Sequence, residues 1–112
     1  MIKHAVMFRF KSDVPDEMRQ SLIDEYLSLP SVYPKMKNYS FGKNISERDQ
    51  TFEYAFSVEF ETEEELKEYL NSKLHEKHVV ERWRPMIESR AIASFVDATP
   101  HGKNQKADPK KS

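Results

Sequence analysis

The sequence contains no cysteine, which excludes disulfide bonds, thiolate metal ligands and thiol nucleophiles. Any chemistry must therefore come from histidine, tyrosine, acidic or basic side chains. The sequence also lacks a run of about 18 apolar residues, the length that a membrane span needs. Residues 1–10 alternate charged with apolar side chains, which excludes the apolar segment of a signal peptide. We expect a cytoplasmic protein that does not associate with membranes.

Neither sign of charge dominates the chain. It has 18 basic and 19 acidic residues, for a formal net charge of −1 at pH 7, which gives no bulk attraction to nucleic acid. Residues 99–112 differ, because they carry four lysines against one aspartate and no large apolar side chain. We predict one folded domain over residues 1–98 and a disordered basic tail over residues 99–112. The tail has no interleaved aromatics, which favours a solvated end over a docking element.

Aromatic residues are plentiful, with seven Phe, five Tyr and one Trp among 112 residues. In two segments they alternate with polar residues, as in strands that bury one face. Over residues 2–10 the apolar positions share a face with His4, and over residues 52–60 one face carries Tyr54 and Phe56. Two less regular segments complete the set of predicted strands, residues 36–45 and residues 91–96.

The first predicted helix runs over residues 15–29. Pro15 suits a first helical turn, and the acidic residues after it suit the positive end of a helix. A repeat of apolar side chains from Met18 to Leu29 indicates a buried face that includes Tyr26. We expect Pro30 to end this helix.

The second predicted helix begins with a capping box at Thr62. Leucines then recur every four residues from Leu66 to Leu74, which places Tyr69 on or beside the buried face. The apolar spacing becomes irregular after this repeat, which predicts a bend before a further helical segment over residues 79–87.

The order of elements is β-α-β-β-α-β, which predicts a ferredoxin-like α+β fold. Two helices would cover one face of a four-stranded sheet. The first strand also carries apolar side chains on its other face, at Ala5 and Met7. A large apolar patch is unusual on a monomer, so we expect a homodimer that buries sheet against sheet.

Four segments, taken in order and spacing, resemble the stress-responsive A/B barrel domain family, known as Dabb. These segments are residues 2–11, residues 42–44, residues 54–61, and Tyr69 followed by residues 75–79. The resemblance spans residues 1 to about 98. It implies a ferredoxin-like protomer that forms a dimeric α/β barrel.

The resemblance also implies a set of site residues. One plant member closes a linear polyketide thioester by an intramolecular aldol condensation, with a catalytic histidine and tyrosine that fall on His78 and Tyr69. Pocket residues of that enzyme fall on His4 and Tyr26. A strand position that is histidine there is Tyr54 here. No cofactor is implied.

His78 and Tyr69 carry functional groups that suit this chemistry. The unperturbed pKa of histidine lies near neutrality, so His78 beside a pocket could remove a proton from a carbon next to a carbonyl. Tyr69 could donate a hydrogen bond to the enolate oxygen that develops. The alternative for His78 is a surface or hydrogen-bonded structural histidine.

Other candidate residues have competing interpretations. Tyr54 and Phe56 could line a cavity, although aromatic rows at this spacing are more often plain core. We include His75 among the substrate-binding residues. His75 and His78 could also share a metal with His4, but a bare HxxH is a weak signal and we expect no metal.

Two functions of different classes follow from these residues. The first is a small cofactor-free enzyme of the cyclase or lyase kind, which uses His-Tyr general acid-base chemistry on a carbonyl-bearing small molecule. The second is a non-catalytic, stress-responsive dimeric protein of the same family. A cavity on which His78 and Tyr69 converge would favour the enzyme, and a filled core with His78 exposed would favour the second.

Overall fold

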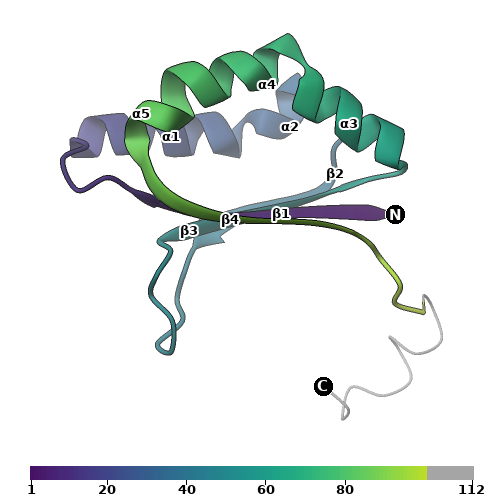
Figure 1. Cartoon of the computed structure of the whole chain (residues 1–112), viewed down its shortest axis with the longest axis horizontal. Helices are drawn as coiled ribbons and strands as arrows, with labels where there is room; N and C mark the ends of the chain where they lie inside the picture. Colours follow the sequence, from purple (N-terminus) through teal and green to yellow (C-terminus); the bar gives the residue numbers. More distant parts are fainter. Residues whose placement is uncertain (101–112) are drawn as a thin grey trace.

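The computed structural model describes residues 1–100, and the predicted basic tail lies, from residue 101 onward, outside the described residues. The strands and helical regions follow one another along the chain in the predicted β-α-β-β-α-β order (Figure 1). In sequence they are β1 (Ile2–Phe10), α1 (Asp16–Leu27), α2 (Leu29–Val32), β2 (Lys37–Lys43), β3 (Tyr54–Phe60), α3 (Glu63–Asn71), α4 (Lys73–His78), the π-helix η1 (Val79–Trp83), α5 (Arg84–Met86) and β4 (Ile87–Val96).

The four strands form one antiparallel sheet in the order β2-β3-β1-β4. Val6 at the middle of β1 pairs with Phe56 of β3 on one side and with Ile92 of β4 on the other. All the helices lie on one face of the sheet, and the opposite face is bare of helices (Figure 1). The ferredoxin-like α+β prediction is confirmed.

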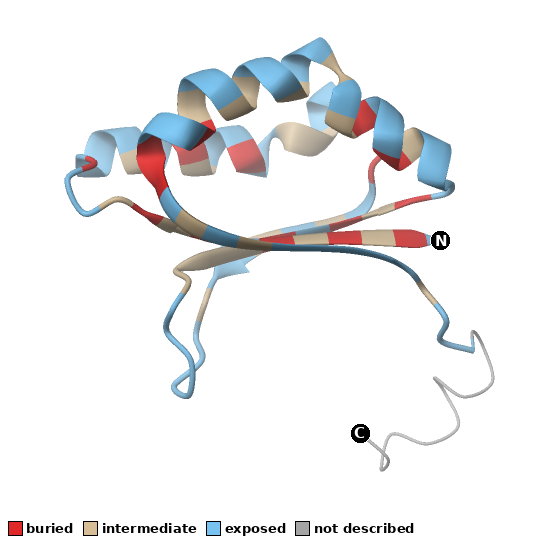
Figure 2. Cartoon of the chain, viewed as in Figure 1, coloured by how far each residue is buried: buried red, intermediate tan, exposed pale blue. Residues whose placement is uncertain are grey.

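The core lies between the helices and the helix-facing side of the sheet (Figure 2). The predicted alternation in β1 is confirmed, because every second residue from Ile2 to Phe10, including His4, is buried. Tyr26 of α1 and Tyr69 of α3 pack onto this face, in two separate clusters of buried side chains. No helix within residues 1–100 is long and apolar enough to cross a membrane.

The first helix differs from the prediction in its end and in its buried face. It ends at Leu27, and Pro30 lies inside the short helix α2, where a first turn tolerates proline. Met18 is 45% exposed, contrary to the expected stripe. Residues eight apart on a helix differ by about 80° in direction, so the face that buries Leu22 and Tyr26 turns Met18 toward solvent.

The second helical region has the predicted cap and bend. The side chain of Thr62 accepts a hydrogen bond from the backbone N–H of Glu65 at 3.2 Å. Ser72 has an extended backbone and starts α4 as a new helix. This restart rotates the leucine stripe, so Leu74 is 57% exposed and the prediction that it is buried was wrong.

Three of the predicted strands have different bounds. The strands β2 and β3 are shorter than expected because the Asn44 side chain donates to the carbonyl oxygens of Asp49 and Phe52, which holds this connection as a loop. The strand β4 begins at Ile87, four residues before the predicted start at Ala91. These first residues of β4 pair with the end of β1, an interaction that the local sequence pattern does not predict.

Candidate functional site

A cavity of about 340 Å³ lies between the helices and strands β1, β3 and β4. Side chains from α1, α3, α4 and η1 form its helical walls. Most of the predicted site residues line it, namely His4, Tyr26, Phe56, Tyr69, His75 and His78. Protein pockets that bind small molecules span about 300–1,000 Å³, so this volume suits a small ligand.

The break at Ser72 positions three of these residues. The Ser72 hydroxyl donates to the carbonyl oxygen of Tyr69 at 2.8 Å, and it accepts from the backbone N–H of His75 at 3.1 Å. The same hydroxyl therefore ends α3 just after Tyr69 and starts α4 just before His75. His78 follows three residues later on α4, so both imidazoles reach the cavity from one short helix.

His78 has a partner on each ring nitrogen. Its Nδ1 lies 3.2 Å from Oε1 of Glu25, and its Nε2 lies 2.8 Å from the hydroxyl of Tyr26. A carboxylate only accepts hydrogen bonds, so Nδ1 carries the proton and Nε2 accepts from Tyr26. This arrangement fixes the tautomer that places the basic nitrogen toward the cavity residue Tyr26.

Glu25 is itself held in place. The Nε atom of Arg82 donates to Oε2 of Glu25 at 2.9 Å, and another guanidinium nitrogen of Arg82 donates to the hydroxyl of Ser21 at 2.9 Å. The arrangement runs from α1 to η1 and orients the carboxylate behind the imidazole of His78.

Burial is the main influence on the pKa of His78. It lowers the pKa below the ordinary value, and the nearby Arg82 charge acts in the same direction. The hydrogen bond and charge of Glu25 oppose this effect, with burial prevailing. His78 is therefore neutral at pH 7, the state in which Nε2 can take up a proton.

Tyr69 supplies a phenol to the same cavity. Its ring packs against Phe60 at 5.7 Å, Tyr33 at 4.8 Å and His75 at 4.8 Å between centroids. Among residues 1–100 its hydroxyl makes no hydrogen bond, and burial raises the pKa of Tyr69 far above 10. The hydroxyl therefore stays protonated and is available to donate to a ligand.

His4 and His75 are two further neutral imidazoles of the cavity. Burial lowers the pKa of both. The Nδ1 of His75 donates to the carbonyl oxygen of Leu70 at 3.0 Å, so its Nε2 is an acceptor. His4 uses Nδ1 in a 2.7 Å contact with the hydroxyl of Ser94 across the β1–β4 pair. Each ring therefore keeps one nitrogen that no other described residue engages.

Tyr26 and Phe56 form an aromatic wall of the cavity. The Tyr26 ring stacks on Phe56 at 5.0 Å and on Phe41 at 5.5 Å between centroids. Burial raises the pKa of Tyr26 well above 10, so its hydroxyl remains the donor to His78. The stacked rings hold that hydroxyl at a fixed place.

Tyr54 lies apart from the other predicted site residues. Its ring stacks against Phe8 and Phe41, and it lines a different hollow at the far end of the sheet. This position agrees with the alternative interpretation of Tyr54 as a residue that packs against the hydrophobic core.

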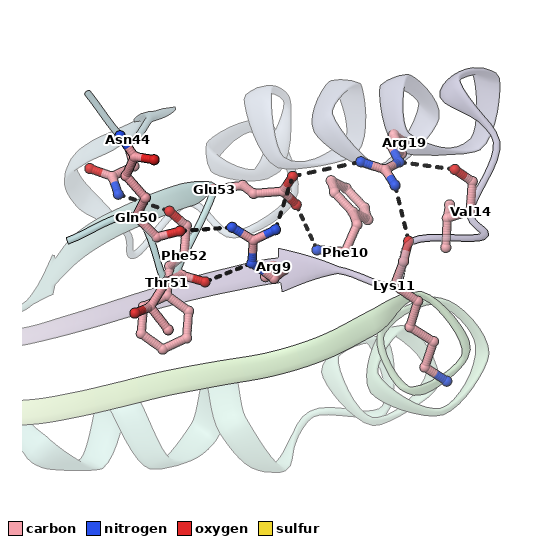
Figure 3. A network of polar contacts seen from close by, with 10 residues as sticks. All are labelled: Arg9, Phe10, Lys11, Val14, Arg19, Asn44, Gln50, Thr51, Phe52 and Glu53. Atoms are coloured by element: carbon pink, nitrogen blue, oxygen red, sulfur yellow. Dashed lines mark hydrogen bonds and ion pairs between the residues drawn. The ribbon is translucent and has the colours of Figure 1, made fainter. Parts of the chain in front are cut away.

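The hollow beside Tyr54 is crossed by a polar network centred on Glu53 (Figure 3). The Glu53 carboxylate accepts from the backbone N–H of Phe10 at 2.9 Å and lies between the guanidinium groups of Arg9 and Arg19. Arg9 also donates to the carbonyl oxygens of Gln50 and Thr51. These contacts tie the β2–β3 connection to β1, so the network has a structural role.

Several residues of the site were not predicted from the sequence. Glu25 lies 53 residues from His78, and no local motif links the two. Arg84 and Arg90 also line the cavity. The alternation of β4 could have placed Arg90 on the helix-facing side, had the strand been recognised to begin at Ile87. Within the described part of the chain, no group of three His, Cys, Asp or Glu is arranged to hold a metal ion.

Comparison with protein families matches residues 2–97 to the Stress responsive A/B Barrel Domain, Dabb. Among curated proteins, olivetolic acid cyclase from Cannabis sativa is 26% identical over 80 residues, which cover 70% of this chain and 76% of the cyclase. The stress-response A/B barrel domain-containing protein HS1 from Arabidopsis thaliana is 30% identical over 76 residues, covering 66% of this chain and 70% of that protein.

Solved structures show the same fold at low sequence identity. The hydroxynitrile lyase from Passiflora edulis has a TM-score of 0.77 at 20% identity, with 88% of this chain and 94% of the lyase covered. A protein from Thermobifida fusca, described as dimeric and ferredoxin-like, has a TM-score of 0.72 at 23% identity, with 86% of this chain and 90% of that protein covered.

Proposed function

The chain belongs to the stress-responsive A/B barrel domain family, and from this premise we propose that it is a small cofactor-independent enzyme of the cyclase or lyase class. Its substrate is a carbonyl-bearing small molecule held in the cavity between helices and sheet. The observation that carries the proposal is His78, whose Nδ1 faces the Glu25 carboxylate and whose Nε2 accepts from Tyr26. A cyclase and a lyase among the similar proteins support this class of reaction.

His78 acts as the general base in the proposed reaction. Its Nε2 takes a proton from the carbon next to a substrate carbonyl, and the imidazolium that forms is stabilised by the Glu25 carboxylate at Nδ1. The electrons of the broken C–H bond move onto the carbonyl oxygen as an enolate. The hydroxyl of Tyr69 donates a hydrogen bond to this oxygen as its charge develops.

The enolate carbon then attacks a second carbonyl of the same molecule in a cyclase reaction. A new carbon–carbon bond forms, and the resulting alkoxide takes the proton back from the imidazolium of His78. A lyase reaction runs the same steps in reverse, with carbon–carbon cleavage. Acid-base assistance of this kind typically contributes about 10² to 10⁴ in rate.

Tyr26 controls the availability of the base. Its hydroxyl occupies the Nε2 lone pair of His78 in the structure. A substrate carbonyl that accepts a hydrogen bond from Tyr26 draws this hydroxyl away and frees Nε2 for the C–H proton. Substrate binding and activation of the base are thereby coupled. His4 and His75, each with one unengaged ring nitrogen, hold the remaining polar groups of the substrate.

Dimer formation through the bare sheet face is part of the proposal. This face carries Met7, which is 44% exposed, among small side chains that leave a hollow of about 540 Å³. The small residues come from all four strands, namely Ala5, Ser40, Gly42, Ala55, Ala91 and Ala93. A second copy would cover the exposed apolar area, and structures with this fold are described as dimeric.

A non-catalytic stress-responsive role is the second candidate. It is favoured by the 30% identity to the Arabidopsis stress-response protein. It is also favoured by the hydrogen bond from the Tyr26 hydroxyl, which engages the Nε2 atom of His78 in the structure. In that case His78 and Tyr26 would be a structural pair of the core.

Turnover of a linear poly-β-keto thioester to a cyclic product tests the enzymatic proposal. We expect His78→Asn to abolish turnover, because asparagine offers no basic nitrogen, and Tyr69→Phe to reduce it by about 10²-fold or more. Lys77→Asn, an exposed neighbour on α4, is the matched control and should retain full activity. Equal turnover by the parent protein and His78→Asn, with both folded, would exclude His78 as the base, and absence of turnover by the folded parent protein would favour the non-catalytic role.

A further inference from the structure

The charged side chains that line the cavity are all of one sign. Its lining includes two arginines, Arg84 and Arg90, and no aspartate or glutamate. The lining imidazoles of His4, His75 and His78 are neutral at pH 7, because burial lowers the pKa of each. The cavity wall therefore has a charge of +2 from the two guanidinium groups.

The two arginines reach the cavity from different elements. Arg84 begins α5, directly after the cavity residue Trp83. Arg90 lies on β4 opposite Phe8 of β1, so its side chain is on the helix-facing side of the sheet. Both residues are exposed and therefore lie where the cavity opens to solvent.

Neither guanidinium group has an ion-pair or hydrogen-bond partner within residues 1–100. Three other arginines of the described chain do have carboxylate partners, whereas the exposed Arg48 has none. Arg9 and Arg19 share Glu53, and Arg82 pairs with Glu25. Two unpaired guanidinium groups at one opening are free to bind an oxyanion.

We propose that Arg84 and Arg90 bind the oxyanion of an organic anion, a carboxylate or a phosphate, whose apolar body occupies the cavity. Guanidinium groups suit this role because their planar N–H donors match the oxygens of carboxylates and phosphates. The inference rests on the proposed function, since it takes the same cavity as the substrate site. It narrows the substrate to a carbonyl compound with a negative charge at one end.

The cavity interior suits the remainder of such a molecule. Phe56, Leu70, Val79 and Trp83 provide apolar surface, and the volume of about 340 Å³ accommodates a six-membered ring with substituents. An anion at the opening would leave the ring inside, near His78 and Tyr69. The charged end would thus orient the reactive part toward the base.

Binding of three ring compounds to the full chain tests this inference. The probes are benzoate, phenyl phosphate and the neutral benzamide, and the signal is the fluorescence of Trp83, the one tryptophan of the sequence. We expect at least one of the two anions to bind about tenfold more tightly than benzamide, since hydrogen bonds to charged groups are the stronger kind. The tighter anion identifies the oxyanion.

Substitutions separate the arginines from general charge effects. The double variant Arg84→Gln with Arg90→Gln should lose the preference for the anion and keep the affinity for benzamide. Arg48→Gln, on the β2–β3 connection away from the cavity, should change neither affinity. Anion affinity no greater than that for benzamide, or unaffected by the double substitution, overturns the proposal.

The His78→Asn variant distinguishes this inference from the proposed activity. It should bind the anion as tightly as the parent chain, because asparagine removes the base and leaves both arginines. Anion binding without turnover by the parent chain would contradict the enzymatic proposal alone. Turnover of neutral substrates without anion preference would contradict the oxyanion site alone.

Discussion

His78 is held by contacts that no neighbouring residue in the sequence supplies. Its two ring nitrogens face Glu25 and Tyr26, adjacent residues of α1 that lie more than fifty positions away. Because Glu25 determines the tautomer, the acid-base character of His78 depends on α1 as much as on α4. The residue is therefore part of a hydrogen-bonded unit that spans two helices.

The pKa of His78 should respond to Glu25. The Glu25 charge raises the pKa of His78 against the lowering effect of burial. Glu25→Gln removes that charge, so we predict a lower pKa in the variant. NMR titration of the imidazole measures it directly. In a pH–rate profile, the acidic limb of activity should shift to lower pH, since the neutral imidazole is the active form and now persists further into acid.

A surface carboxylate gives the control for this titration. Glu47→Gln, on the exposed β2–β3 connection, should leave the His78 titration unchanged. An unchanged or raised pKa in Glu25→Gln would mean that the carboxylate does not stabilise the imidazolium.

At the residue scale, a feature of the site can be predicted from the sequence only when the residues that determine it lie close together along the chain. The inward position of His4 and the burial of Tyr69 follow from alternation and helical spacing within one element. The contact between Tyr26 and His78 depends on how two helices pack over the sheet, and periodicity within either helix does not specify it. Tyr54 shares the face of Phe56, yet lies two residues earlier on β3, beyond the cavity.

At the scale of elements, the break at Ser72 shapes the site. Without it, α3 and α4 would be one helix, and the directions of Tyr69 and His75 would follow a single helical repeat. The extended backbone at Ser72 and its two hydrogen bonds instead interrupt the helix, so that α4 starts in a new direction. This break brings the rings of Tyr69 and His75 to 4.8 Å between centroids.

Removal of the Ser72 hydroxyl should weaken both the fold and the site. We predict that Ser72→Ala lowers the free energy of unfolding by about 1 kcal/mol, the usual cost of losing a helix cap. It should also weaken ligand binding, because the hydroxyl joins Tyr69 to the start of α4. Denaturant unfolding and Trp83 fluorescence measure the two effects.

The cap of the preceding helix provides a matched comparison. Thr62→Ala removes the corresponding cap of α3, which lies two turns from Tyr69. It should cost a similar free energy and leave ligand affinity unchanged. Equal losses of affinity in both variants would assign the Ser72 effect to general stability.

Element prediction succeeded where a signal is local. The helix cap at Thr62 and the alternation in β1 each lie within a few residues, and both are confirmed, although the Glu65 carboxylate accepts from the backbone N–H of Glu61 rather than from that of Thr62. The exposure of Leu74 and the early start of β4 were missed because each depends on the chain around it. Ser72 restarts the helix before Leu74, and pairing with β1 extends β4 back to Ile87.

At the scale of the whole molecule, the sheet has one covered and one bare face (Figure 1). The cavity lies on the covered side, so dimer formation through the bare face would leave it open. We predict that Met7→Glu, which places a charge on the bare face, converts a dimer to a monomer in sedimentation analysis.

An equally exposed methionine provides the control for this prediction. Met18 on α1 is 45% exposed, against 44% for Met7, but lies on the helical side. Met18→Glu should therefore leave the dimer intact. Dissociation by both substitutions, or by neither, would show that the bare face is not the dimer interface.

The central claim is that His78 removes a proton from a carbon next to a carbonyl, and deuterium exchange tests it most directly. An aryl methyl ketone in D₂O, followed by NMR, reports proton abstraction without knowledge of the natural substrate. At ketone concentrations that saturate the Trp83 fluorescence change, the parent protein should accelerate exchange of the methyl hydrogens. His78→Asn should bind the ketone and lose that acceleration. Saturated binding with no acceleration by the parent protein, or equal acceleration by His78→Asn, would contradict the account.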